Sequence, residues 1–255
     1  MEVLVFDIFG SFGHYRKFYT TSSALTYPFP PPTAIRGLIG AIVGYGRNEY
    51  LEKTKDLRVG VQILNPIKII KASINYISTK EGDYELDKKL SNKKDSVKIT
   101  RTQVIKQILV EPKFRIFACG EGEVFDKLKE YLKEEKVFYT PVLGTSEHLA
   151  EVEYVGCYPI RQVENYEGCC FSVCPVEFWE DPEITSVKLG KELIPYDLDQ
   201  NRLNPRCVQN RLNPRYVEVL YSKDPKVPIR GKFKKVWLVE NFEEELAITL
   251  FPYEP

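Results

Sequence analysis

The sequence predicts an α+β fold, with a ferredoxin-like domain over residues 1–160 and a smaller β-rich domain or extension over 161–255. Three observations predict it. Strand-like and helical segments alternate in the first part, a long charged segment interrupts them, and the last part holds several β-like runs without a long amphipathic helix. With 255 residues and 43% hydrophobic side chains, the chain is long enough to bury a core.

The first element is a strand. Residues 2–9 (EVLVFDIF) are rich in β-branched and aromatic side chains, with one polar break at Asp7. Glycines at 10 and 13 then predict a turn.

The first helix follows the segment TYPFPPPTAIRGLIGAIVGYG (26–46). Pro30–Pro32 hold the chain extended, and Thr33 is the expected N-cap, so we expect the helix to begin at about Thr33. One buried stripe is predicted by spacing: Ile35, Leu38, Ile39, Ile42 and Val43. A second stripe has almost no side chain: Ala34, Gly37, Ala41 and Gly44. Glycine in a helix costs roughly 1 kcal/mol relative to alanine, so this stripe predicts close internal packing or a contact with nucleic acid or a subunit.

The remaining elements complete the order. We expect a strand at 58–78, a charged thumb-like insertion at about 79–98, a β-rich segment at 99–120, a helix at 123–136 and a strand at 152–160. This β-α-β, insertion, β-α-β order is the ferredoxin-like plan. The β-like runs beyond residue 160 include a polar segment in which QNRLNPR occurs twice, at 200–206 and 209–215.

Composition excludes several classes of protein. The 36 basic and 36 acidic side chains cancel, which argues against a histone-like or tail-type nucleic-acid binder but allows local basic patches. The start lacks a basic leader and no apolar run spans a membrane, so we expect a cytoplasmic protein without a membrane partner. The six cysteines show no C-x-x-C pair and the two histidines lie far apart in sequence, so we expect buried thiols, no metal and no cofactor.

The loop GSFGHYRKFYTTSSALTY (10–27) combines glycines, aromatic rings, hydroxyls and the cations Arg16 and Lys17. Such a loop offers backbone N–H groups, charge and stacking faces to a single-stranded RNA. An ordinary polar connection with its aromatic rings in the core is the alternative. The residues His14, Tyr15 and Lys17 also suggest a metal-independent ribonuclease, with a general base for a ribose 2′-hydroxyl and a lysine for the phosphorane.

Three segments resemble CRISPR-associated (Cas) protein family five, the subunit that caps the 5′ end of the guide RNA in the Cascade complex. They are FDIFGSFGHYRKFYTTSSALTYPFPPPTAIRGLIGAIVG at the start, TRTQVIKQILVEPKFRIF in the middle and YTPVLGTSEHLAEVEYVG at 139–156. The resemblance covers roughly residues 1–160 and is greatest to type I-B members.

The resemblance implies a RAMP-type ferredoxin-like domain with a thumb, which binds the 5′ handle of crRNA and contacts the Cascade backbone and large subunits. Target DNA would be met only indirectly. In one branch, type I-C, the homologous protein cuts precursor RNA with tyrosine, lysine and histidine; in most others the subunit is non-catalytic. We therefore expect a non-catalytic RNA-binding subunit, with an endoribonuclease that processes CRISPR repeats (His14, Tyr15, Lys17) as the alternative and a single-strand binder outside any CRISPR system as the third possibility. The expected RNA-binding residues are His14, Tyr15, Arg16, Lys17, Thr33, Arg36, Lys98 and Arg101.

Overall fold

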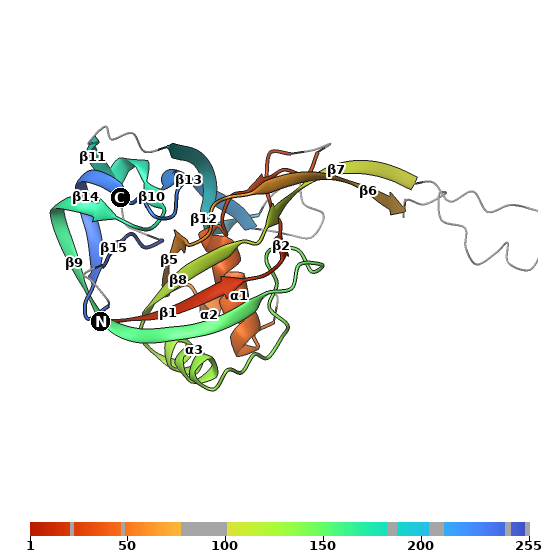
Figure 1. Cartoon of the computed structure of the whole chain (residues 1–255). Helices are drawn as coiled ribbons and strands as arrows, with labels where there is room; N and C mark the ends of the chain where they lie inside the picture. The colour runs from red at the N-terminus through yellow and green to blue at the C-terminus, as the bar shows by residue number, and fades with distance from the viewer. Residues whose placement is uncertain are drawn as a thin grey trace, which may run out of the picture.

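The computed structural model describes residues 1–20, 23–46, 49–77, 101–182, 188–203, 212–242 and 246–252. Within these ranges the chain is a mixed α/β protein dominated by strands, and its main sheet curls into a half barrel (Figure 1). This sheet has seven strands in the order β11-β14-β9-β1-β8-β5, with β15 paired to β14. The strands are β1 (Glu2–Phe9), β5 (Arg58–Ile63), β8 (Lys113–Gly120), β9 (Glu151–Cys170), β11 (Trp179–Pro182), β14 (Ile229–Val239) and β15 (Leu246–Ile248).

The other strands of the described ranges form smaller sheets in the orders β2-β7-β6, β10-β13-β12 and β3-β4. Their bounds are β2 (Phe12–Gly13), β3 (Tyr15–Arg16), β4 (Thr26–Tyr27), β6 (Ile69–Ile77), β7 (Arg101–Val110), β10 (Cys174–Pro175), β12 (Leu189–Leu203) and β13 (Leu212–Ser222). The helices are α1 (Pro32–Val43), α2 (Tyr50–Lys53), α3 (Glu123–Lys133) and a 3₁₀ turn at Val176–Phe178. Among the described helices, none combines the length and the apolar character that crossing a bilayer requires.

Strand β1 confirms the first predicted element and is buried on both faces of the main sheet. Leu4, Phe6 and Ile8 belong to the core that also contains the apolar face of α1, whereas Val3 and Val5 belong to a second core with residues of β14 and β15. The polar break is Asp7, which is 3% exposed and accepts hydrogen bonds from Arg115 Nε and Nη2 at 2.8 and 3.0 Å. A continuous apolar strand is therefore compatible with one carboxylate because that carboxylate is paired.

Strand β9 is longer than the strand that we predicted at 152–160. Its first half pairs with β1, up to Pro159, and its second half pairs with β14, from Ile160 to Cys170. Residue 160, where we expected the first domain to end, thus lies inside a strand. Main-chain pairing continues across the expected boundary and joins the C-terminal strands to the same sheet.

Helix α1 begins one residue earlier than predicted, and Thr33 is not its N-cap. Pro31 occupies the N-cap position in an extended conformation, no side chain caps the helix, and Pro32 is the first helical residue. Proline suits this position because its ring fixes a helical φ and the missing N–H would have no intrahelical partner. The predicted apolar stripe is buried as expected, and the helix ends at Gly44 in the left-handed conformation (φ 86°).

The single strand predicted over 58–78 is two strands in different sheets. Pro66, which has no N–H to donate, lies in the break between β5 and β6. Strand β6 pairs with β7 in antiparallel register from Ile69↔Leu109 to Ile77↔Arg101, and the two leave the body of the molecule as a ribbon (Figure 1). The thumb expected at 79–98 lies outside the described residues, between the ends of these two strands.

The predicted segments at 99–120 and 123–136 are confirmed with shorter bounds. The first contains β7 and β8, and the second contains α3, which ends before Glu135, a residue with positive φ (53°). Three apolar residues of α3 are buried: Phe125, Leu128 and Leu132.

The cysteines within the described residues are free thiols. Cys119, Cys170 and Cys174 are buried as expected, whereas Cys157 and Cys169 are only partly buried; Cys207 lies outside the described residues.

Candidate RNA-binding surface

The loop between β1 and α1 is fixed by main-chain contacts to two distant segments. Strand β2 pairs with β7, and the His14 N–H donates to the Leu143 carbonyl at 2.9 Å. Gly144 lies so close to His14 that a Cβ atom would stand 2.0 Å from the His14 carbonyl oxygen, and its φ is positive (93°). Only glycine fits this position, so segment 139–150 has a defined place against the loop.

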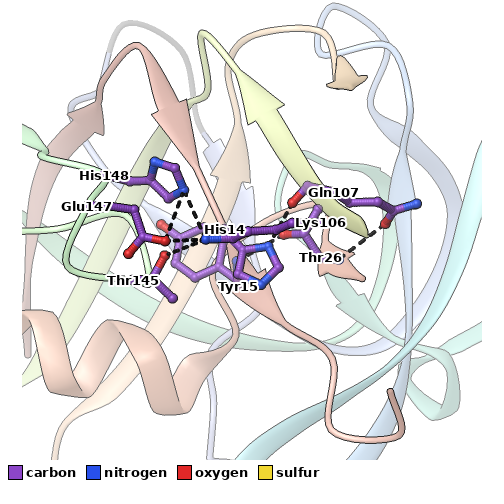
Figure 2. A network of polar contacts seen from close by, with 8 residues as sticks. All are labelled: His14, Tyr15, Thr26, Lys106, Gln107, Thr145, Glu147 and His148. Atoms are coloured by element: carbon purple, nitrogen blue, oxygen red, sulfur yellow. Dashed lines mark hydrogen bonds and ion pairs between the residues drawn. The ribbon is translucent and has the colours of Figure 1, made fainter. Parts of the chain in front are cut away.

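Figure 2 shows a network of polar contacts in which His14 contacts Gln107 of β7, and Lys106 of the same strand contacts residues of segment 139–150. The imidazole is 2% exposed, and its Nδ1 lies 2.8 Å from the Gln107 carbonyl oxygen, to which it can donate. Burial lowers the pKa of His14, and the neighbouring Lys106 and His148 add to that effect. The imidazole is therefore held neutral inside the protein, where a bulky substrate does not reach it.

Lys106 is the centre of this network. It is 3% exposed, forms an ion pair with Glu147, and lies 3.3 Å from Thr145 Oγ1 and 3.5 Å from His148 Nε2 (Figure 2). Burial raises the pKa of Glu147, but the hydrogen bonds from Lys106, Thr145 and the backbone, together with the Lys106 charge, outweigh burial and bring that pKa to about 2. Burial and Lys106 together lower the pKa of His148. The network joins β7 to segment 139–150 through a buried charge that has a partner.

Tyr15 and Arg16 point in opposite directions from β3. Tyr15 is 5% exposed and its ring meets Phe114 edge-on, while burial raises the pKa of its phenol well above the usual range. Arg16 is exposed and donates a hydrogen bond from Nη2 to the Thr20 carbonyl at 3.2 Å. Of this pair, Arg16 is the residue whose charge faces solvent.

Lys17 forms an ion pair with Glu192 of β12, and Tyr19 donates a hydrogen bond to the same carboxylate at 3.3 Å. Burial lowers the pKa of Lys17, but the hydrogen bonds to Glu192 and Tyr19 outweigh it and leave the pKa raised. The ammonium group also lies 5.6 Å from the centre of the Tyr27 ring. The rings of Phe18 and Tyr19 are about half exposed beside it.

Arg36 is also paired with a carboxylate of β12. Its Nη1 donates to Asp197 Oδ1 at 2.9 Å and its Nη2 to the Leu57 carbonyl at 3.4 Å, and its side chain is 6% exposed. The Thr33 hydroxyl lies 3.5 Å from the Pro195 carbonyl oxygen of the same strand. A phosphate contact by Lys17 or Arg36, which stays a prediction, therefore requires an ion pair with β12 to open.

Arg101 is exposed at the end of the β6–β7 ribbon, and Lys98 lies outside the described residues. The structure thus brings Lys17, Thr33 and Arg36 together against β12, places His14 in the network of Figure 2, and leaves Arg16 and Arg101 facing solvent. It gives His14, Tyr15 and Lys17 separate partners and does not join them into one catalytic group.

Sequence reasoning missed the residues that hold these side chains, which are Lys106, Gln107, Glu147, His148, Glu192 and Asp197. The signal for four of them was present, because the segment TRTQVIKQILVEPKFRIF contains Lys106 and Gln107 and the segment YTPVLGTSEHLAEVEYVG contains Glu147 and His148. Glu192 and Asp197 of β12 carry no such signal in the sequence. They lie 175 and 161 residues from Lys17 and Arg36, and only the fold brings the partners together. Among the described residues, no group of three histidine, cysteine or acidic side chains is arranged to hold a metal ion.

Comparisons with known proteins agree with this architecture. No curated protein matches the sequence. A solved structure described as a CRISPR protein from Archaeoglobus fulgidus is similar over 97% of this chain and 99% of its own, with 15% identity and a TM-score of 0.54. A chain of a structure described as a CRISPR RNA-guided surveillance complex is similar over 90% of this chain and 91% of its own, with 14% identity and a TM-score of 0.51. Residues 3–202 match the family described as CRISPR-associated protein (Cas_Cas5), and the chain therefore belongs to the Cas5 family.

Proposed function

We propose that this chain is a non-catalytic, cytoplasmic subunit of a type I CRISPR surveillance complex, Cascade, and that it binds and caps the 5′ handle of crRNA. In this role it contacts the backbone and large subunits, meets target DNA only indirectly and needs no cofactor. The observation that carries the proposal is membership of the Cas5 family over residues 3–202. The surveillance-complex chain with the same fold along nine-tenths of its length supports it. We retain type I-B as the subtype because of the motifs in the first 160 residues.

The arrangement of strands supports a RAMP-type ferredoxin-like domain. Strands β1, β5, β8 and β9 lie in the order β9-β1-β8-β5 with antiparallel neighbours, and α1 and α3 follow β1 and β8 in the chain. This order agrees with the β-α-β-β-α-β plan, in which the β6–β7 ribbon would be inserted between the second and third strands. We infer that the ribbon is the base of a thumb that reaches the neighbouring backbone subunit.

The chemistry of the candidate catalytic residues favours a non-catalytic role. Cleavage at a ribose 2′-hydroxyl needs a base within hydrogen-bond reach of the substrate and a cation at the phosphorane. His14 is buried against Gln107, Tyr15 keeps its proton because burial raises its pKa, and Lys17 is neutralised by Glu192. A metal-independent endoribonuclease remains the second candidate function, and the observation in its favour is the proximity of Lys106 to His148.

The test uses purified protein, a labelled CRISPR-repeat RNA and a chelator near neutral pH. We expect the RNA to be bound and to remain intact for hours. A single cut that leaves a 2′,3′-cyclic phosphate, and that His14→Ala or Lys17→Ala abolishes while affinity is retained, would establish the endoribonuclease instead. His148→Ala, assayed in the same way, tests the cluster around Lys106. Affinity is measured on every variant, so that lost binding is not mistaken for lost cleavage.

A further inference from the structure

A cavity of about 220 Å³ lies between α1, Tyr50 of α2 and the segment that contains Val142 and Gly144. None of the residues that line it is charged, and most of them are apolar. Its polar side chains are those of Tyr15, Thr33 and Tyr50. Two of these, Tyr15 and Thr33, are residues that the sequence predicts to contact RNA.

One wall of the cavity is the small-residue stripe of α1, formed by Ala34, Gly37 and Ala41. A Cβ atom added at Gly37 would have its nearest neighbour at 3.9 Å, in the Tyr50 ring, so packing does not require glycine there. Gly40 differs, because its added Cβ would stand 2.6 Å from Tyr50 Cβ. Gly37 therefore lowers the stability of the helix relative to alanine, and in place of a close contact it leaves open space.

The Tyr15 side chain gives a second, independent indication of a ligand. It is 5% exposed and lines the cavity, and none of the described residues forms a hydrogen bond with its hydroxyl. The hydroxyl oxygen is not among the fully buried atoms without a partner, so it opens to the cavity and can hydrogen-bond with whatever fills the cavity. A ligand in this cavity would supply the missing partner.

We propose that this cavity receives one unstacked base of a single-stranded RNA, an inference that rests on the proposed RNA-binding function and gives it a base-specific site. The uncharged lining does not suit a phosphate, whereas it suits a neutral ring that lies against the flat wall of α1. The hydroxyls of Tyr15 and Thr33 suit the polar edge of a base. An aliphatic or phenylalanine side chain of a partner protein would leave the Tyr15 hydroxyl unpaired. Splayed bases held against aromatic rings are the usual mode of single-strand RNA recognition.

The experiment measures the binding of fluorescein-labelled handle RNAs that each carry one abasic nucleotide, scanned through the sequence. The proteins are wild type, Gly37→Leu, which fills the cavity, and Tyr15→Phe, which removes only the hydroxyl. Gly46→Leu is the matched control, because Gly46 is exposed and outside the lining. We expect one abasic position to weaken wild-type binding about tenfold. An abasic nucleotide at the same position should not weaken RNA binding by Gly37→Leu, since that variant has already lost the base contact. It should weaken RNA binding by Tyr15→Phe less than it weakens binding by the wild type.

Thermal melting of each variant shows whether it is folded, and if Gly37→Leu is not, Tyr15→Phe decides alone. If the proteins bind RNA but every abasic position weakens binding equally in the wild type and in both variants, the base site is overturned and the RNA-binding function stands. No binding of handle RNA by the wild type overturns both. If Gly37→Leu binds every RNA normally but no longer joins a partner subunit, the cavity takes a protein side chain and the base site is wrong.

Discussion

Two regions of the molecule carry cations that the sequence predicts to bind RNA, and they differ in how those cations are held. Against β12, Lys17 and Arg36 are paired with Glu192 and Asp197, carboxylates that lie 175 and 161 residues away in the chain. On the β6–β7 ribbon, Arg101 is exposed and forms no ion pair with a residue of the described ranges. A cation in a loop rich in aromatic rings is thus not by itself a free phosphate ligand, because the fold has already supplied anions to the first region.

The ribbon carries exposed apolar side chains as well. Ile70, Tyr76 and Ile105 are about half exposed, as are Phe18 and Tyr19 beside Lys17. A two-stranded ribbon cannot bury such residues by itself, and exposed apolar side chains gathered in one place are typical of a contact with a partner. We therefore expect the ribbon to act in assembly and RNA contact, and the ion pairs of β12 to stabilise the fold.

The largest effect is expected from Asp197→Ala. This change leaves the Arg36 guanidinium, whose side chain is 6% exposed, without its carboxylate. Breaking a buried ion pair on one side typically costs about 3 kcal/mol of the free energy of unfolding, whereas Arg101→Ala on the ribbon should change it by less than about 0.5 kcal/mol. Urea denaturation of both variants measures the difference. Equal stabilities would remove the distinction between the two regions.

The pH dependence of stability should come from the network around Lys106 and not from the ribbon. Burial lowers the pKa of both His14 and His148, so the folded protein keeps them neutral where the unfolded chain, with a pKa near 6.5, binds protons. The unfolded state then carries more protons, and the free energy of unfolding falls as pH drops below about 6.5, by at most about 1.4 kcal/mol per pH unit for each histidine. Urea titrations at pH 7.5 and 5.5 measure this loss. His14→Asn should reduce it, and an unchanged loss would contradict a buried neutral His14.

A smaller effect, on RNA binding, is expected when the carboxylate of one β12 ion pair is neutralised and its cation is kept. Glu192→Gln keeps the shape and the hydrogen bonding of the side chain but frees the Lys17 charge. If phosphate can replace the carboxylate, handle RNA should bind more tightly and the salt slope should steepen by about 0.7, the value for one contact on a single strand. Fluorescence anisotropy between low and moderate salt gives this slope. A slope and affinity equal to wild type would mean that Lys17 acts in the fold alone.

Local patterns predicted the elements well, because the apolar periodicity of 35–43 and the β-branched run at 2–9 depend on neighbouring residues. They predicted boundaries less well: Pro66 divides a run that is apolar on both sides, and β9 continues past residue 160 because β14 pairs with it. The candidate site was predicted only in part. The loop 10–27 was predicted, but its Lys17 is neutralised by Glu192 of β12 and its His14 contacts Gln107 of β7 and Leu143, and these contacts join residues far apart in sequence.

The most direct test is the salt dependence of handle-RNA binding to two double variants that each remove two charged side chains; the first lowers the net charge by two and the second leaves it unchanged. One is Arg16→Ala with Arg101→Ala, which removes exposed cations, and the other is Lys17→Ala with Glu192→Gln, which removes a cation together with its anion. We predict that the first reduces the salt slope by about 1.4, which corresponds to two single-strand contacts, and that the second changes it by less than half as much. A slope that falls with the second pair and not with the first would contradict the account, because the RNA would then be held by the region that β12 covers.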